Sequence, residues 1–282
     1  MTSWSGTLRP RRSAPRPQLV GLSSRKVRGP VLGALGLGIA LALWQLLAAT
    51  RVLDPQAIPT MVSTFRTIGD SIQTRHLWVG VGQTLEATAI GFAIGSALGI
   101  VAGTIIGLNR FAYASCFLLI EFCKTIPIIA VLPLFVLLFG TTLKMKVLAI
   151  IFGGFFPTVI QTIYGVRSVD PVVGDTATIF GLGRVRRFLM VTVPSAAPYL
   201  ATGLRLGATG ALLIDIVAEI TAGGSGIGLQ VLQAQAAGDV AYTYALLVII
   251  GCIGMLIVLG ITALERRLLS WHEVYRHQAG QP

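Results

Sequence analysis

Long apolar runs are the feature that most constrains the fold of this chain. A helix needs roughly 20 apolar residues to cross the ~30 Å hydrocarbon core of a bilayer. Six mainly apolar segments reach that length: residues 31–50, 83–107, 111–139, 145–166, 198–221 and 241–264. Because lipid offers the backbone no hydrogen-bond partners, such segments form helices that satisfy their own peptide groups. The sequence therefore predicts an all-α, polytopic membrane protein with about six transmembrane helices.

The composition agrees with this prediction and excludes an ordinary soluble domain. Of the 282 residues, 54% are hydrophobic and 12% are charged, whereas soluble domains contain about 25% charged residues. The net charge is +11, but residues 1–30 alone hold seven Lys and Arg and no acid. Since this basic stretch is also rich in Pro and Ser, we interpret it as a disordered tail beside an anionic membrane surface. We expect no nucleic-acid partner.

The distribution of Lys and Arg predicts the orientation of the spans, because cytoplasmic segments are enriched in these residues. With the N-terminus in the cytoplasm, the inner segments hold fifteen of them and the outer segments five, among them Lys144 and Lys146. We therefore expect an N-in/C-in topology in the cell (inner or plasma) membrane. Three regions follow: a cytoplasmic tail (1–30), a transmembrane domain (31–275) and a second cytoplasmic tail (276–282).

An amphipathic pattern lies between the first two spans. Met61, Phe65, Ile68 and Ile72 recur at spacings of three and four residues. This spacing is typical of a helix that lies in the membrane interface with one apolar face toward the lipid. A plain surface loop is the alternative.

Glycines form a regular ladder in the second span. The five members are each four residues apart: Gly91, Gly95, Gly99, Gly103 and Gly107. Small residues at this spacing let two helix backbones approach closely in lipid, where packing drives helix association. We interpret the ladder as a helix-packing face, which is also compatible with a neighbouring helix sliding along it.

The third span is interrupted by Pro127 and Pro133, and it carries Glu121 and Lys124 three residues apart. Proline frees backbone groups that lipid cannot satisfy, so this span is expected to face protein or a wet cavity. Glu121 and Lys124 fit either a pathway or gate, or a stabilising ion pair near the end of a helix.

Further polar residues lie inside the later spans, where an ionisable group is costly and suggests function. Asp215 and Glu219 are four residues apart on one helix face near its outer end, and Gln161 lies in the fourth span. The two carboxylates fit a cavity mouth or a contact with a partner. The candidate pathway or gate residues are Glu121, Pro127, Pro133, Gln161, Asp215 and Glu219.

The sequence predicts no catalytic residue, metal site or cofactor in this chain. No Cys–His pair has the spacing of metal ligands. The glycine-rich stretch TAGGSGIGLQ (residues 221–230) lacks the Lys and the preceding strand of a phosphate-binding loop. We interpret it as a flexible external turn or gate.

The stretch between the fourth and fifth spans is short, polar and basic. Asp170–Pro171 is typical of a helix start, because Asp caps free N–H groups and Pro suits the first helical position. Gly181 suits a helix C-terminus in the left-handed conformation, and Gly183 allows a turn. Pro194 is expected to end a second short helix, residues 184–192, before the next span. These signals predict a rigid helix–turn unit on the cytoplasmic face.

This stretch resembles the "EAA" motif of binding-protein-dependent ABC importer permeases, in which Glu-Ala-Ala, three residues and Gly precede a Leu-Pro by about a dozen residues. Asp175, Thr176 and Val193 stand for the Glu, the first Ala and the Leu. Ala177, Gly181 and Pro194 match the pattern. Further stretches are similar to the sulfonate/taurine/nitrate branch of that superfamily, so that the resemblance covers residues 31–275: Ile126-Pro127, Gly154–Pro157, Gly165–Pro171, Thr202–Arg205 and Leu264–Trp271.

The resemblance implies a type I ABC importer permease fold and a transport subunit rather than an enzyme. Its implied activity is ATP-driven import of a small anionic organic or inorganic solute by alternating access. The implied partners are a second permease copy in a homodimer, two cytoplasmic ATPase subunits that bind ATP and Mg, an extracytoplasmic solute-binding protein, and membrane lipid. The coupling helix within residues 170–194 then contacts the ATPase through Asp175, Thr176, Ala177, Phe180, Gly181, Arg184, Phe188 and Pro194.

A secondary transporter or channel for a small solute is the alternative, because broken helices also bind ions at mid-membrane in such proteins. That alternative supplies no reason for the rigid cytoplasmic unit.

Overall fold

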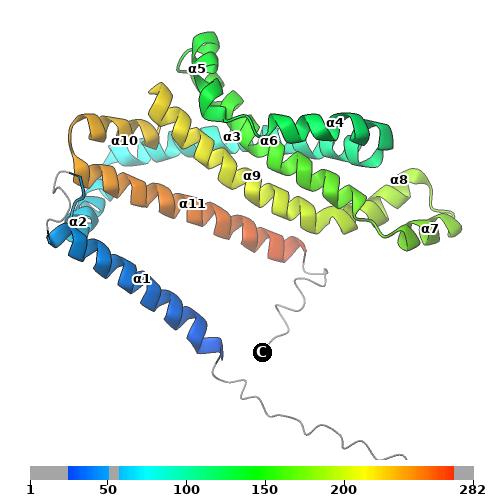
Figure 1. Ribbon diagram of the computed structural model, residues 1–282, viewed down its shortest axis with the longest axis horizontal. Helices are drawn as coiled ribbons and strands as arrows, with labels where there is room; N and C mark the ends of the chain where they lie inside the picture. The colour runs from blue at the N-terminus through cyan, green and yellow to red at the C-terminus, as the bar shows by residue number, and fades with distance from the viewer. Residues whose placement is uncertain (1–24, 51–56, 270–282) are drawn as a thin grey trace, which may run out of the picture.

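A computed structural model describes residues 25–50 and 57–269; the basic tail as far as residue 24 and the predicted C-terminal tail lie outside this part (Figure 1). Within it the chain is helical apart from short turns, which confirms the all-α prediction. The helices are α1 (Arg25–Ala49), α2 (Met61–Ile72), α3 (Arg75–Leu108), α4 (Arg110–Cys123), α5 (Ile128–Phe139), α6 (Leu143–Arg167), α7 (Pro171–Ile179), α8 (Arg184–Arg187), the π-helix η1 (Phe188–Thr192), α9 (Val193–Ala222), α10 (Ile227–Ala236) and α11 (Val240–Leu268).

The number of spans agrees with the prediction. In the described part of the chain, five helical stretches are long and apolar enough to cross a membrane, and there are six if α4 and α5 together form one span. These two helices are bent by 87° relative to each other. Pro127 is the residue just before the first turn of α5, whereas Pro133 lies inside that helix without ending it. The third span is therefore broken, as expected, and α5 turns away from the long helices (Figure 1).

The long helices α3, α6 and α9 form the centre of the molecule, with α6 packed against both others. The glycine ladder of α3 lies directly against α6. A Cβ atom at Gly95 would lie 2.7 Å from the carbonyl oxygen of Ile151, and one at Gly103 would lie 2.7 Å from that of Val159. The ladder is thus a helix-packing face, as predicted; sliding along it stays a prediction.

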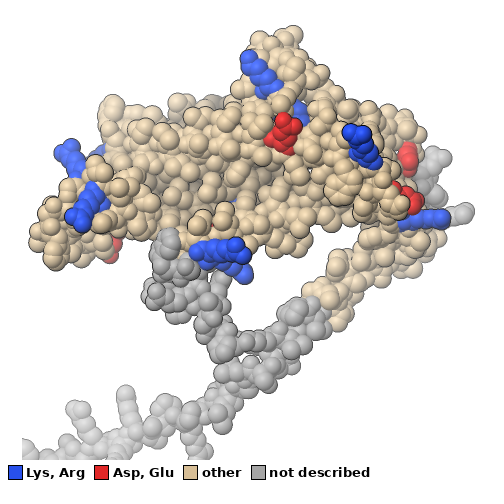
Figure 2. Space-filling model, turned by 180° about the vertical axis from the view of Figure 1, so that it is seen from behind, with Lys and Arg blue, Asp and Glu red and all other residues tan. Residues whose placement is uncertain are grey.

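Glycines also bring α9 close to α6. A Cβ atom at Gly153 would lie 2.8 Å from the carbonyl carbon of Gly210, and one at Gly207 would lie 3.1 Å from the carbonyl oxygen of Gly154. Such backbone contact between small residues is typical of helices that associate in lipid. The charged side chains are sparse over the long helices on the face in Figure 2.

α2 confirms the predicted amphipathic helix, so the loop alternative is wrong. The Thr60 hydroxyl accepts a hydrogen bond from the Ser63 N–H at 3.2 Å and caps the helix. Thr64 is buried toward the rest of the chain, whereas Phe65 and Ile72 are each 47% exposed. An apolar face is therefore available to lipid, and the location of α2 in the membrane interface stays a prediction.

α1 contacts the other helices near its C-terminal end. The Trp44 indole N–H donates to the Pro59 carbonyl at 3.2 Å, and the Trp44 ring lies 6.1 Å from that of Tyr244. From this contact α1 runs away from the bundle (Figure 1), and Leu32 and Leu35 are exposed.

The expectation that Pro194 ends a short helix is wrong. The helix continues from Arg184 to Ala222 through α8, η1 and α9. In η1 the Val193 N–H donates to the carbonyl of Phe188, five residues earlier. This wider π-helical turn relieves the clash between the Pro194 ring and the preceding turn, so the helix does not stop.

Candidate coupling segment, cavity and buried ion cluster

α7 begins and ends at the residues expected from the sequence. The Asp170 carboxylate accepts from the Val172 N–H at 2.8 Å, and Pro171 occupies the first helical position. At the other end Gly181 has φ +71°. The Leu182 N–H donates to the Ala177 carbonyl and the Gly181 N–H to that of Thr178, both at 3.0 Å. This Schellman arrangement satisfies carbonyls that the helix end leaves free.

Arg187 fixes α7 against α8. Its guanidinium donates to the Thr178 hydroxyl at 3.3 Å. A Cβ atom at the buried Gly174 would lie 2.8 Å from Nη2 of Arg187, so the glycine leaves room for the guanidinium. The segment is therefore a preformed unit of two helices, which lies at one end of the long helices (Figure 1).

The predicted coupling residues divide into an exposed and an internal group. The exposed group is Asp175, Thr176, Phe180, Gly181 and Arg184. Ala177 is buried, and Phe188 and Pro194 are half-buried. The residues of the internal group therefore pack against other parts of the chain and leave the exposed group available to a partner.

Two apolar residues of this segment were missed from the sequence. Ile179 is 85% exposed and Val185 is 74% exposed, close to Phe180 in the chain, which is 79% exposed. The sequence feature that could have pointed to these two residues is an apolar side chain within a polar stretch that is too short to span a membrane. Exposed apolar side chains gathered in one short segment are typical of a protein contact.

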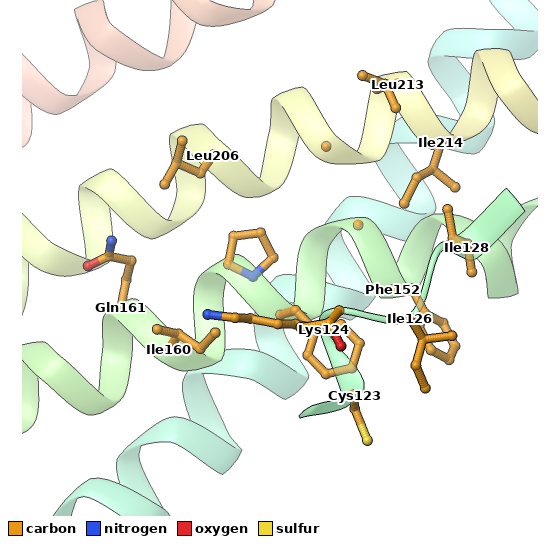
Figure 3. A pocket seen from close by; sticks show the side chains of 15 residues that line it. Cys123, Lys124, Ile126, Ile128, Phe152, Ile160, Gln161, Leu206, Leu213 and Ile214 are labelled. Carbon is orange, nitrogen blue, oxygen red and sulfur yellow. The ribbon is translucent and has the colours of Figure 1, made fainter. Parts of the chain in front are cut away.

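A cavity of about 610 Å³ lies where the break between α4 and α5 meets α6 and α9 (Figure 3). Its wall is mainly apolar, with Phe152 and Leu213 among the lining residues, and Lys124 and Gln161 contribute polar atoms. Lys124 points along the cavity toward the end where Gln161 and Ile160 lie (Figure 3). The bend of the third span thus opens a cavity beside the central helices.

The six predicted pathway residues occupy different places. Gln161 lines the cavity, and Pro127 lies in the break between the lining residues Ile126 and Ile128. Glu121 pairs with the cavity residue Lys124 at 2.6 Å, which fits either of the two interpretations of this pair. Pro133 lies farther along α5. A pathway role for these residues stays a prediction.

Asp215 and Glu219, the remaining two, lie in a buried ion cluster with Lys146. The Lys146 ammonium lies 3.3 Å from Asp215 Oδ1 and also pairs with Glu219. The side chains of Asp215 and Glu219 are 0% exposed and that of Lys146 is 1% exposed. Lys146 lies in the first turn of α6, which starts at Leu143, and it is buried inside the chain; the side of the membrane on which it lies stays a prediction. The two acids lie inside this chain rather than at a cavity mouth.

One continuous helix joins the segment to the cavity. The stretch Arg184–Ala222 comprises 39 residues and begins beside α7. Leu206, Gly210, Leu213 and Ile214 of the same stretch line the cavity. The segment and part of the cavity wall therefore belong to the same helical stretch. The described part of the chain is therefore a multi-spanning membrane bundle with a preformed helical unit at one end and a cavity beside its central helices.

Comparison with known proteins gives the class of this protein. Residues 95–270 match the family described as "Binding-protein-dependent transport system inner membrane component". The chain is 30% identical over 251 residues to the putative aliphatic sulfonates transport permease protein SsuC of Bacillus subtilis (strain 168), covering 89% of this chain and 91% of that protein. It is 29% identical over 244 residues to the taurine transport system permease protein TauC of Escherichia coli (strain K12), covering 84% and 88%.

Solved structures have the same fold. A crystal structure of a bacterial ABC transporter involved in the import of the acidic polysaccharide alginate matches with a TM-score of 0.60 and 14% identity, over 86% of this chain and 93% of that chain.

This chain belongs to the binding-protein-dependent transport system inner membrane component family. It is the permease subunit of an ABC importer, a transport component rather than an enzyme, and a multi-pass protein of the plasma (inner) membrane. Family membership decides against the secondary transporter and the channel.

Proposed function

We propose that two copies of this chain form the pathway of an importer for a small anionic solute and that residues 170–194 couple the pathway to ATP hydrolysis. The observation that carries the proposal is the continuous helix Arg184–Ala222, which reaches from the coupling segment to the cavity wall. Because no loop interrupts this stretch, it offers a direct path for a rigid-body displacement. The cavity is then one section of the pathway.

The proposed substrate is a sulfonate-, taurine- or nitrate-like solute. The Lys124 ammonium in an otherwise mainly apolar cavity favours a solute with negative charge. The pairing of Lys124 with Glu121 at 2.6 Å keeps that attraction moderate, so that a solute passes through instead of binding tightly. The relatives named for aliphatic sulfonates and taurine support the same class.

The proposed partners follow from the two ends of the molecule. Two ATPase subunits, which bind ATP and Mg, contact the exposed side of α7 and α8 in the cytoplasm. A solute-binding protein delivers the substrate at the opposite, outer end, where α2 and α10 lie (Figure 1). The N-in/C-in orientation, in which residues 170–194 carry three Arg on the inner side, supports this arrangement.

The test is uptake by proteoliposomes that contain the permease, its ATPase subunit and its binding protein. Gly181 has φ +71° and no atom within 4 Å of an added Cβ, and both Asn and Asp tolerate this conformation. Gly181→Asp adds a charge to the contact surface and is expected to abolish uptake, whereas Gly181→Asn is expected to retain most of it. Normal uptake by Gly181→Asp would contradict the coupling role.

A further inference from the structure

The turn between α9 and α10 is built around the carboxylate of Glu219. The Gly228 N–H donates to Glu219 Oε2 at 2.8 Å. Gly226 has φ +136°, and a Cβ atom there would overlap the same carboxylate. At Gly228 a Cβ atom would lie 2.6 Å from that of Glu219. The glycines of this stretch therefore allow the backbone to enclose a buried acid.

Lys146 ties the same turn to α6. Its ammonium donates to the Ser225 carbonyl at 2.7 Å and to the Glu219 carboxylate. The ammonium also lies 3.3 Å from Asp215 Oδ1. One side chain from the first turn of α6 thus contacts the turn and both acids of α9.

Two threonines of α3 complete the cluster. The Thr84 hydroxyl lies 2.9 Å from Glu219 Oε1, to which it donates, and it accepts from the Ile227 N–H at 3.0 Å. The Thr88 hydroxyl donates to Asp215 Oδ2 at 2.8 Å. Thr84 therefore connects α3 to the first residue of α10. The side-chain hydrogen bond of Thr88 connects α3 to α9 instead.

α10 is also fixed beyond the cluster. The Gln230 amide donates to the His76 carbonyl of α3 at 2.7 Å. Ile227 and Val231 are buried together with Leu77 and Leu246 in one apolar cluster. α10 is therefore packed against three helices, α3, α9 and α11.

Opening this turn would take backbone hydrogen-bond partners away from charges that the interior cannot solvate. If residues 223–228 moved away, Glu219 would lose the Gly228 N–H as a donor and Lys146 the Ser225 carbonyl as an acceptor. A buried charged group that loses a hydrogen-bond partner and gains no water in exchange is destabilised. The cluster therefore opposes exactly the motion that a flexible gate requires.

We propose that Lys146, Asp215 and Glu219 are positioning residues that lock the outer turn and α10 (residues 223–236) to α3, α6 and α9. Through the transport cycle these elements move as one rigid body, and residues 223–236 are not a separate gate. The cycle itself rests on the proposed function, whereas the lock is a property of the single chain.

The test measures the distance between spin labels at Gln235 of α10 and Leu98 of α3, both exposed, after replacement of Cys116, Cys123 and Cys252 by Ala. Labelled copies are diluted with unlabelled ones so that the distance is measured within one chain. The distribution is expected to be narrow and the same without nucleotide and in the ATP–vanadate state. A shift of this distance with nucleotide would overturn the lock.

Matched glycine variants test the contact with Glu219. Gly228→Ala places a methyl group against Glu219, whereas Gly224→Ala makes an ordinary contact of 3.6 Å with the Lys146 stem. Gly228→Ala is expected to broaden the distance distribution, and Gly224→Ala to leave it narrow. Equal widths for both variants would overturn the proposal.

A conservative pair keeps the test decisive if Gly228→Ala does not fold. Thr84→Val removes the bond to Ile227 and is expected to broaden the distribution, whereas Thr88→Val is expected not to. A distribution as narrow in Thr84→Val as in Thr88→Val would count against the lock. A separate measurement places one label at Gln235 in each of the two copies and follows the distance between the copies. If nucleotide does not change that distance, the result counts against the proposed function and leaves the single-chain result standing.

Discussion

Lys146, Asp215 and Glu219 carry charges into a part of the bundle where solvent does not reach them. A buried ion pair gains stability only while every partner is present, since each ion has lost its hydration. The glycines of α3 and α6 are sensitive for a different reason, because backbone atoms of the neighbouring helix occupy the space of a Cβ atom. Single residues of both kinds therefore determine whether the central helices pack.

Loss of the lysine alone should destabilise the protein strongly. Lys146→Met leaves two buried carboxylates without a counter-ion, and breaking a buried pair costs about 3–5 kcal/mol. The triple variant Lys146→Met, Asp215→Asn, Glu219→Gln removes all three charges and is expected to recover most of that loss. Unfolding in detergent, followed by circular dichroism, measures both; equal stability of Lys146→Met and the unaltered protein would contradict the buried cluster.

A methyl group in the glycine ladder should separate α3 from α6. Gly95→Ala would place a Cβ 2.7 Å from the Ile151 carbonyl oxygen, whereas Gly82 of the same helix has open space around it. We expect Gly95→Ala to lower stability by about 1–3 kcal/mol, as overpacking does. Gly82→Ala is the control and should be neutral or stabilising, because Ala favours helix over Gly. Thermal unfolding measures the stability of both variants; equal stability of Gly95→Ala and Gly82→Ala would contradict the close packing of α3 against α6.

At the scale of elements, the coupling segment combines a fixed backbone with an apolar surface. Its helix α7 is capped at both ends, and Arg187 holds it against α8. Ile179, Phe180 and Val185 remain exposed. The segment is therefore ready to bind a partner without first becoming ordered, which lowers the entropic cost of association.

Removal of one of these apolar side chains should weaken the contact with the ATPase. Burial of an Ile side chain contributes about 1.5–3 kcal/mol, and 1.4 kcal/mol is a factor of about ten in affinity. We therefore expect Ile179→Ser to weaken ATPase binding by about tenfold or more. Val62→Ser is the control, because Val62 is 66% exposed on α2 at the opposite end of the molecule. Binding of the purified ATPase to permease in nanodiscs gives both affinities; equal values would contradict the apolar contact.

Features that depend on neighbouring residues in the chain were predictable from the sequence. The cap at Asp170–Pro171 and the left-handed Gly181 are local, and the glycine ladder needs only its own helix periodicity. The partners of Lys146 lie more than sixty residues away, so counting charges by segment gave no sign that Lys146 is buried. Pro194 was misjudged because a π-helical turn before a proline has no clear sequence signal.

At the scale of the whole molecule, the helical stretch Arg184–Ala222 links features at both ends of the central helices. The coupling segment lies at one end of Arg184–Ala222 and the ion cluster holds the other end, with the cavity between them. A displacement of the coupling segment must therefore either bend this helix or move the cavity wall. The glycine contacts of α6 with both α3 and α9 favour a joint movement of all three helices.

Cys123 provides a native reporter of that movement, because it lines the cavity as a free, half-buried cysteine. With Cys116 and Cys252 replaced by Ala, the rate of Cys123 labelling by a charged thiol reagent is measured in the reconstituted complex, without nucleotide and in the ATP–vanadate state. We expect the two rates to differ several-fold in this background and to be equal when Gly181→Asp is added. Equal rates without Gly181→Asp, or a nucleotide effect that persists with it, would contradict coupling between residues 170–194 and the cavity.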